Sequence, residues 1–271
     1  MVTVSLYKPG AVNYSFPFPQ EWNEFTTAQL QAVANAFYIS QKEEAETKAA
    51  VLFNLLNMHR KKLPMNTIKH IDIDDLATVG SDLIQFIWED NHLTRQPYPV
   101  LRIGWRHKFT GPADGFDNLT CGEYEQAEIE LARFNKEKKI HHLAAMAAIL
   151  YRPKGVKLYS FKPSINEYEL YQYEKMIPAF LKLPPEVLYT IFLWYCGCRN
   201  MMVKYFPYVY SGGGAGVPDI LAFTRCIHAA AGDKNGSRQQ VRLLLVKELH
   251  FEMNEEAKKA EELEKKYAQQ S

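Results

Sequence analysis

Apolar side chains recur every three to four positions along most of the chain, which is the spacing of one face of an α-helix. The first such stretch, residues 26–40, has Thr26 three positions before Gln29, and this predicts a capping box at the start of the helix. Residues 42–62 continue the pattern. Further helices are predicted at residues 72–90, 121–139, 140–153, 166–181, 183–206, 218–232 and 236–270.

Two stretches depart from helical spacing. Residues 1–22 alternate weakly and contain three prolines, which predicts an extended N-terminal arm or an edge strand, because proline cannot donate to a β ladder. Residues 98–109 alternate apolar and basic side chains around a glycine, which predicts a short β hairpin. The expected fold is therefore mainly α: a multi-helix globular domain with this hairpin, the arm and a long C-terminal helix.

Composition shifts divide the predicted helices into domains. A glycine-rich hinge is expected at residues 211–217, between a helical core domain at 23–210 and a C-terminal helical segment at 218–271. Residues 153–165 are expected to form a loop. The last helix, at 236–270, would extend for roughly 50 Å. Its apolar residues thin toward the end, so the tail is either solvated or completed by a partner helix, and both alternatives stay open.

Charge is balanced, with 32 basic and 31 acidic side chains and a net charge of +1. This argues against a general nucleic-acid or membrane-surface binder but leaves room for a local basic patch. Arg102, Arg106 and Lys108 would share one face of a strand and are the best candidates for anion or nucleic-acid contact. A solvated strand face is the alternative. The basic cluster at 59–62 suits a helix C-terminus, with a phosphate contact as its alternative.

Four cysteines are too few and too scattered for a disulfide scaffold, and the N-terminus has no signal-peptide pattern. We therefore expect a reducing cytoplasmic setting. Cys196, Cys198, Cys226 and His228 offer three thiols and an imidazole, formally enough for zinc. Both pairs fall in predicted helices, where residues two apart point about 200° apart, so we favour buried apolar roles for the thiols.

No catalytic constellation emerges from the remaining polar residues. The glycines at 212–216 lack the Lys-Ser/Thr of a phosphate-binding loop, and the adjacent His141 and His142 project in different directions on a helix. The helical glutamates between 123 and 130 are expected to be solvated. We therefore expect no enzyme activity, no cofactor and no metal.

The stretch GPADGFDNLTCGEYEQAE, residues 111–128, follows the rules of turns and caps. Thr120 and Glu123 are spaced as a capping box, and Leu119 can pack on Tyr124 as a hydrophobic staple. Together with HLAAMAAILYRPKG and LPPEVLYTIFLWYCGC, this stretch resembles a loosely defined group of proteins encoded by phages and prophages of Bacteroidetes. The resemblance covers residues 110–206, and that group has no catalytic motif to carry over.

What the resemblance implies is a tail-region morphogenesis factor similar to tail assembly chaperones. We accordingly expect a non-enzymatic bacteriophage protein that acts by protein–protein contacts in tail or virion assembly, either as a chaperone or as a structural component of the tail or connector. Its partners would be other phage structural proteins such as a tape-measure protein, in an oligomer or larger assembly. It would be found in the host cytoplasm and, as a component, in the virion. The alternative is a nucleic-acid-binding accessory protein that uses the basic strand 102–108.

Overall fold

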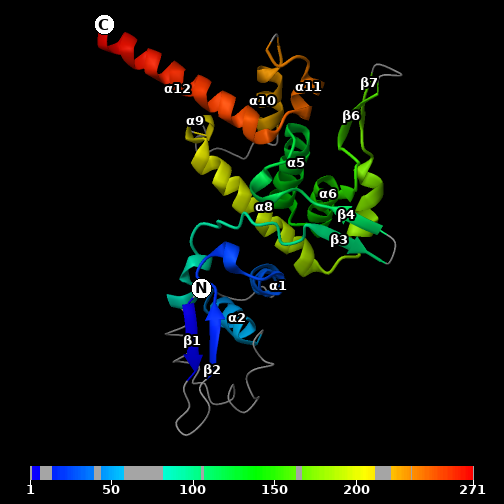
Figure 1. The fold of residues 1–271 in the computed structure, drawn as a ribbon, viewed down its shortest axis with the longest axis vertical. Helices are drawn as coiled ribbons and strands as arrows, with labels where there is room; N and C mark the ends of the chain where they lie inside the picture. Colours follow the sequence, from blue (N-terminus) through cyan, green and yellow to red (C-terminus); the bar gives the residue numbers. More distant parts are fainter. Residues whose placement is uncertain are drawn as a thin grey trace. The chain divides into compact units, whose positions relative to one another are not determined.

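A computed structural model describes residues 2–6, 14–39, 44–57, 82–104, 107–162, 167–210, 221–232 and 234–270 (Figure 1). Contacts within the chain divide it into two compact units. Unit 1 comprises Met1–Pro97 and Pro184–Cys198, and unit 2 comprises Tyr98–Leu183 and Arg199–Ser271. This division reflects only contacts within the chain. The predicted core domain at 23–210 and C-terminal segment at 218–271 therefore stay predictions. The predicted hinge at 211–217 lies outside the described residues.

Unit 1 begins with the predicted N-terminal arm, which consists of two antiparallel strands. Strand β1 (Val2–Leu6) pairs with β2 (Tyr14–Phe18), with Val2 opposite Phe18. The helices that follow are α1 (Thr27–Ala34), a π-helical turn (Asn35–Ile39), α2 (Glu44–Asn57) and the first part of α8 (Pro185–Tyr205). The capping box of Thr26 and Gln29 is confirmed at the start of α1.

Helix α8 supplies the most buried side chains of unit 1, as its nearly continuous apolar character predicted. Trp194 and Tyr195 are fully buried, and the Trp194 Nε1 donates a 2.9 Å hydrogen bond to the Thr94 carbonyl. Gly197 allows the Leu93 backbone to approach, because a Cβ at this position would lie 2.3 Å from the Leu93 carbonyl oxygen. The glycine therefore permits close packing within a continuous helix and does not break it.

Unit 2 is built around a pair of helices joined by a short connection. Its strands are β3 (Val100–Ile103), β4 (His107–Thr110), β5 (Arg152–Pro153), β6 (Tyr159–Lys162) and β7 (Glu167–Leu170). Its helices are α5 (Cys121–Glu137), α6 (Ile140–Leu150), α7 (Ile177–Phe180), the end of α8, α9 (Pro207–Tyr210), α10 (Ala222–Ala230), α11 (Arg238–Leu243) and α12 (Val246–Gln270).

Helices α5 and α6 form the centre of unit 2. Every side chain of α6 from Leu143 to Leu150 is buried, and small alanines at 144, 145, 147 and 148 let neighbouring elements pack closely. The predicted hairpin near 98–109 is confirmed: β3 and β4 pair antiparallel, and β5 adds a third strand. Phe109 on its buried face contacts Phe180 with ring centroids 5.1 Å apart. The mainly helical fold class is thus confirmed.

The helix predicted at residues 166–181 is wrong for its first half. Residues Glu167–Leu170 form β7, which pairs antiparallel with β6 inside the segment that was predicted to be the loop 153–165. A 3-10 turn (Tyr173–Met176) and the short α7 follow. The sequence EYEL alternates polar and apolar residues, a pattern that suits a strand once a partner strand is present.

The single long C-terminal helix predicted from residue 236 is also wrong. It is two helices, α11 and α12, separated by an extended Leu244 with φ −65° and ψ 153°. The Leu244 carbonyl accepts a 2.8 Å hydrogen bond from the Cys121 amide, and the Val246 amide donates to the Leu119 carbonyl at 2.9 Å. The break exists because this backbone pairs with the chain just before α5.

Two other predictions fall partly or wholly outside the described residues. The basic cluster at 59–62 is outside them, and α2 is described only as far as Asn57. Of the helix predicted at 72–90, only residues 82–90 are described, with a helical segment at 82–84 and a 3-10 turn (Gln85–Ile87).

Candidate functional site

The chain enters α5 through the turn and cap that the sequence predicted. The Thr120 amide donates to Glu123 Oε2 at 2.7 Å, and the Glu123 amide donates to Thr120 Oγ1 at 3.4 Å. The Ala113 amide donates to Asn118 Oδ1 at 2.6 Å and closes the preceding turn. These contacts satisfy the free amides at the helix start, which is a structural role.

The glutamates of α5 are not solvated, and the expectation for them is wrong. Glu123, Glu125 and Glu130 are 5%, 2% and 5% exposed. Such buried carboxylates need partners, because burial of an unpaired charge is costly. The partners come from other elements as well as α5: Glu123 pairs with Arg152, Glu125 with Arg242, Glu128 with Arg199, and Glu130 with His142 and Arg133.

The Glu125–Arg242 pair shows the best geometry of this set. Arg242 Nε and one terminal nitrogen donate to the two oxygens of Glu125 at 2.7 and 3.0 Å. The same guanidinium lies 5.8 Å from the Tyr159 ring centroid. The hydrogen bond to Glu125 raises the pKa of Arg242. Charges held in fixed pairs of this kind fasten α5 to its neighbours.

His142 and His141 behave differently, although they are adjacent. His142 Nδ1 lies 2.8 Å from Glu130 Oε2, and its Nε2 lies 3.4 Å from Glu137, whereas His141 is exposed.

Cys198 is fully buried, and its thiol lies 3.8 Å from the Thr94 carbonyl oxygen. Among the described residues, no three His, Cys, Asp or Glu side chains gather as a metal site.

A buried histidine on α12 is enclosed by aromatic rings. His250 is 1% exposed and stacks on Phe223 and Tyr210, with centroids 5.4 and 5.7 Å away. Its Nδ1 donates to the Val246 carbonyl at 2.8 Å, so Nε2 accepts the hydrogen bond from the Tyr210 hydroxyl at 2.9 Å. Burial lowers the pKa of His250 from its usual 6.5, so the ring is held neutral.

A groove of about 580 Å³ lies between α10 and α12. Its walls carry mainly small side chains, including Ala229, Ala230, Ala257 and Ala260, with Leu249 and Met253 deeper on α12. Lys234 at its rim forms ion pairs with Glu252 at 3.2 Å and Glu256 at 3.4 Å. Small side chains on these walls leave room for the backbone of a helix to approach closely.

The stripe of α12 that enters this groove continues along the outer half of the helix. Val246, Leu249, Met253, Ala260, Leu263 and Tyr267 lie on one side of the helix at heptad spacing, and Glu256 occupies the heptad position between Met253 and Ala260. Val246 and Leu249 are buried, whereas Leu263 and Tyr267 are 52% and 69% exposed. In Figure 1 the outer half of α12 extends away from α10 and α11. We call Ala260, Leu263 and Tyr267 the outer stripe.

The basic residues predicted on the hairpin are partly brought together. Arg102 on β3 lies directly opposite Lys108 on β4, and both are exposed, whereas Leu101 and Phe109 point into the core. Arg106 lies outside the described residues. Like charges placed opposite each other on a sheet destabilise it, so this pair costs stability.

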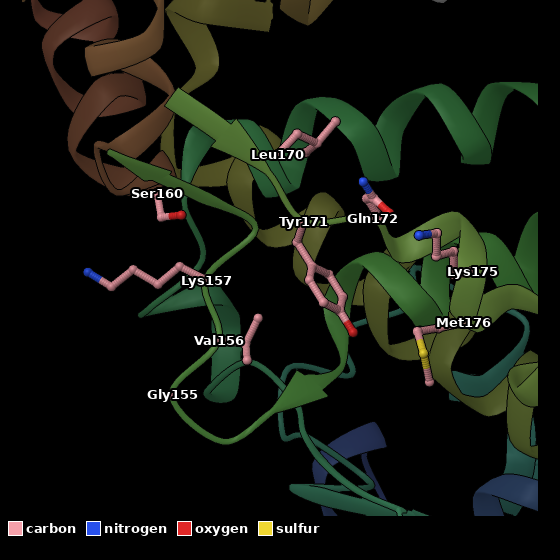
Figure 2. Close-up of a pocket in the computed structure, with 9 residues that line it drawn as sticks. All are labelled: Gly155, Val156, Lys157, Ser160, Leu170, Tyr171, Gln172, Lys175 and Met176. Carbon is pink, nitrogen blue, oxygen red and sulfur yellow. The ribbon is translucent and has the colours of Figure 1, made fainter. Parts of the chain in front are cut away.

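A pocket of about 620 Å³ lies beside β6 and β7 (Figure 2). Lys157 and Lys175 are among its lining residues, and no Asp or Glu is. Figure 2 shows the Tyr171 ring between Val156 and Met176, with the Lys175 side chain beside Gln172 and the Lys157 side chain extending away from the others. The pocket combines positive charge at its rim with an aromatic and apolar interior.

Sequence reasoning missed the buried glutamates, the His250 enclosure and this pocket. The only available signal for the glutamates was the alternation of acidic and apolar residues between 121 and 131. Among the described residues, no helix combines the length and apolar character needed to cross a membrane. Searches of family models, curated proteins and solved structures find no match to the chain.

Proposed function

We propose that this chain is a non-enzymatic assembly protein that acts through contacts with other proteins, and that α12 is its principal contact element. The outer stripe of α12 carries this proposal, because Leu263 and Tyr267 are 52% and 69% exposed on the side of the helix where Val246 and Leu249 are buried. Exposed apolar side chains along one side of a helix are typical of a surface that packs on another protein.

The groove beside α10 supports the same proposal. It shares Ala257 and Ala260 with α12, so a partner helix that follows the outer stripe would enter the groove at its inner end. Burying the parts of Leu263 and Tyr267 that are exposed, 52% and 69%, would contribute about 1 to 2 kcal/mol for each side chain. The charged residues that flank the stripe, such as Lys259 and Glu264, offer pairs to a helical partner.

The resemblance to phage tail morphogenesis proteins suggests the setting for this contact. In that setting the partner is a helical phage structural protein, with the tape-measure protein as the first candidate. A chaperone would release this partner before the particle is complete, whereas a structural component would remain. The host cytoplasm is the expected site of assembly in either case.

Co-expression with the tail proteins of its own phage tests the proposal. The variant Leu263→Ser/Tyr267→Ser should lose co-purification with its partner. The matched control Lys258→Ser/Glu262→Ser, on the opposite side of α12, should retain it. Equal binding by the two variants, or no complex with any tail protein, would refute the proposal. Mass spectrometry of purified virions then separates a component, which is present, from a chaperone, which is absent.

A further inference from the structure

Three exposed cations, Arg102, Lys108 and Lys154, form a short row on the three-stranded sheet of unit 2 and the turn that follows it. Arg102 on β3 lies opposite Lys108 on β4, and Thr110 lies opposite Arg152 on β5. Lys154 follows β5 directly, in the turn after Pro153, and it too is exposed. Arg102 and Lys108 therefore lie side by side on adjacent strands, about 5 Å apart along the hydrogen-bonding direction, and Lys154 adds a third positive charge in the turn after the next strand.

In the part of the chain that the structure describes, no acidic side chain balances the positive charges of this row. Among the described residues, none of Arg102, Lys108 and Lys154 forms an ion pair, whereas the α5 glutamates of the same unit are all paired. Repulsion within the row works against the sheet, and a bound polyanion would remove that repulsion. The arrangement is that of a surface that gains stability when it is occupied.

Along the chain, the row is followed directly by residues of the pocket shown in Figure 2. Gly155, Val156 and Lys157, which line the pocket, follow Lys154 in the chain, and the Val156 amide donates to the Pro153 carbonyl at 3.0 Å to close this turn. Lys175 adds a cation on the other side of the pocket, and the partly exposed Tyr171 ring lies inside it. Proteins that bind single-stranded nucleic acid combine cations that contact successive phosphates with an aromatic ring on which a base stacks.

We propose that the exposed face of β3 and β4 and the adjoining pocket bind single-stranded nucleic acid, with phosphates on Arg102, Lys108 and Lys154 and a base stacked on Tyr171. The net charge of +1 is compatible with this because the site is local. It uses five cations at most, with Lys157 and Lys175 at the pocket. Affinity should therefore be modest and strongly salt-dependent, with no preference set by base edges.

Fluorescence anisotropy with labelled oligothymidylate, using the full chain, measures this binding. With five phosphate contacts the slope of log affinity against log salt is about −3.5, so affinity should fall about 100-fold between 50 and 200 mM salt. The variant Arg102→Gln/Lys108→Gln/Lys154→Gln should reduce the slope to about −1.4 and the fall to about sevenfold. Tyr171→Leu should weaken binding at least about fivefold without changing the slope.

The control variant Lys136→Gln/Lys182→Gln/Lys258→Gln removes the same number of exposed positive charges elsewhere. It should bind as the wild type does, and circular dichroism should show that all variants are folded. If the two triple variants lose the same affinity, binding depends only on net charge, and this would overturn the proposal. Absence of binding at 50 mM salt would overturn it too. Competition by polyglutamate as effective as that by oligothymidylate would identify an acidic polypeptide as the occupant, and this would also overturn it.

Discussion

Replacing Arg242 with methionine should strongly destabilise unit 2. Arg242 makes two hydrogen bonds, of 2.7 and 3.0 Å, to Glu125, whose side chain is 2% exposed, while the Arg242 side chain is 19% exposed. Methionine keeps much of the apolar volume beside Tyr159 but leaves the buried carboxylate without its cation. Removing one partner of a buried ion pair costs about 3 to 5 kcal/mol. For a domain of this size that corresponds to a fall in Tm of roughly 6 to 20 °C.

Two further variants separate the unpaired charge from the loss of packing. In Glu125→Leu/Arg242→Met both charges are replaced by apolar side chains, and stability should return to within about 1 kcal/mol of the wild type. Arg133→Met is the control, because its side chain is 50% exposed and Glu130 keeps His142 as a partner. It should cost no more than about 1 kcal/mol.

Urea unfolding followed by circular dichroism gives the free energies for all three variants. The explanation by a buried unpaired charge predicts a large loss for Arg242→Met alone, recovery in the double variant and little change in the control. If Arg242→Met costs no more than Arg133→Met, or if the double variant is as unstable as Arg242→Met, the α5 ion pairs do not hold this unit together in the way described.

Three further predictions concern other parts of the fold. Because the folded-state pKa of His250 lies below its unfolded value of about 6.5, its contribution to stability is present above that pH and is lost as the pH falls through the folded pKa. Urea titrations from pH 7.5 to 5 should therefore show a smaller loss of stability in His250→Phe than in the wild type; identical slopes in the two proteins would contradict this. Gly197→Ala should destabilise unit 1 by about 1 to 3 kcal/mol because its Cβ would lie 2.3 Å from the Leu93 carbonyl oxygen, and a Tm as high as that of the exposed control Lys204→Ala would disprove the close approach. Lys108→Glu should raise stability by about 0.5 to 1 kcal/mol, since it turns a repulsive pair with Arg102 into an attractive one; unchanged or lower stability in low-salt urea unfolding would count against that pairing.

Features set by nearby residues could be predicted from the sequence. The capping boxes of Thr26 and Thr120 were correct because each depends on side chains only three positions apart. The buried helix α8 was predictable because it is apolar on nearly every side. The hairpin of β3 and β4 was predictable because its strands alternate and are joined by a short turn that contains Gly104.

The errors share a cause, which is pairing between residues far apart in the chain. Glu125 appears solvated in a helical pattern, and only Arg242, 117 positions later, explains its burial. The leucines at 243–245 fit a continuous helix, but the backbone there bonds to residues 119 and 121 and must be extended. The strand β7 likewise needed β6 to be recognised. For the same reason the candidate pocket, formed by β6, β7 and the turn after β5, had no local signature.

The backbone bridge between Thr120 and Leu245 also determines how α12 presents its outer stripe. This bridge and the ion pair of Lys247 with Asp117, at 2.5 Å, hold the start of α12. The fold of unit 2 therefore fixes the direction in which the outer stripe faces. The partner proposed above would therefore meet a helix whose orientation is already fixed and which extends about 24 Å beyond Asn254, the last residue that is buried among those described. The entropy of orienting that helix has already been lost in folding, so less of the contact energy is consumed on association.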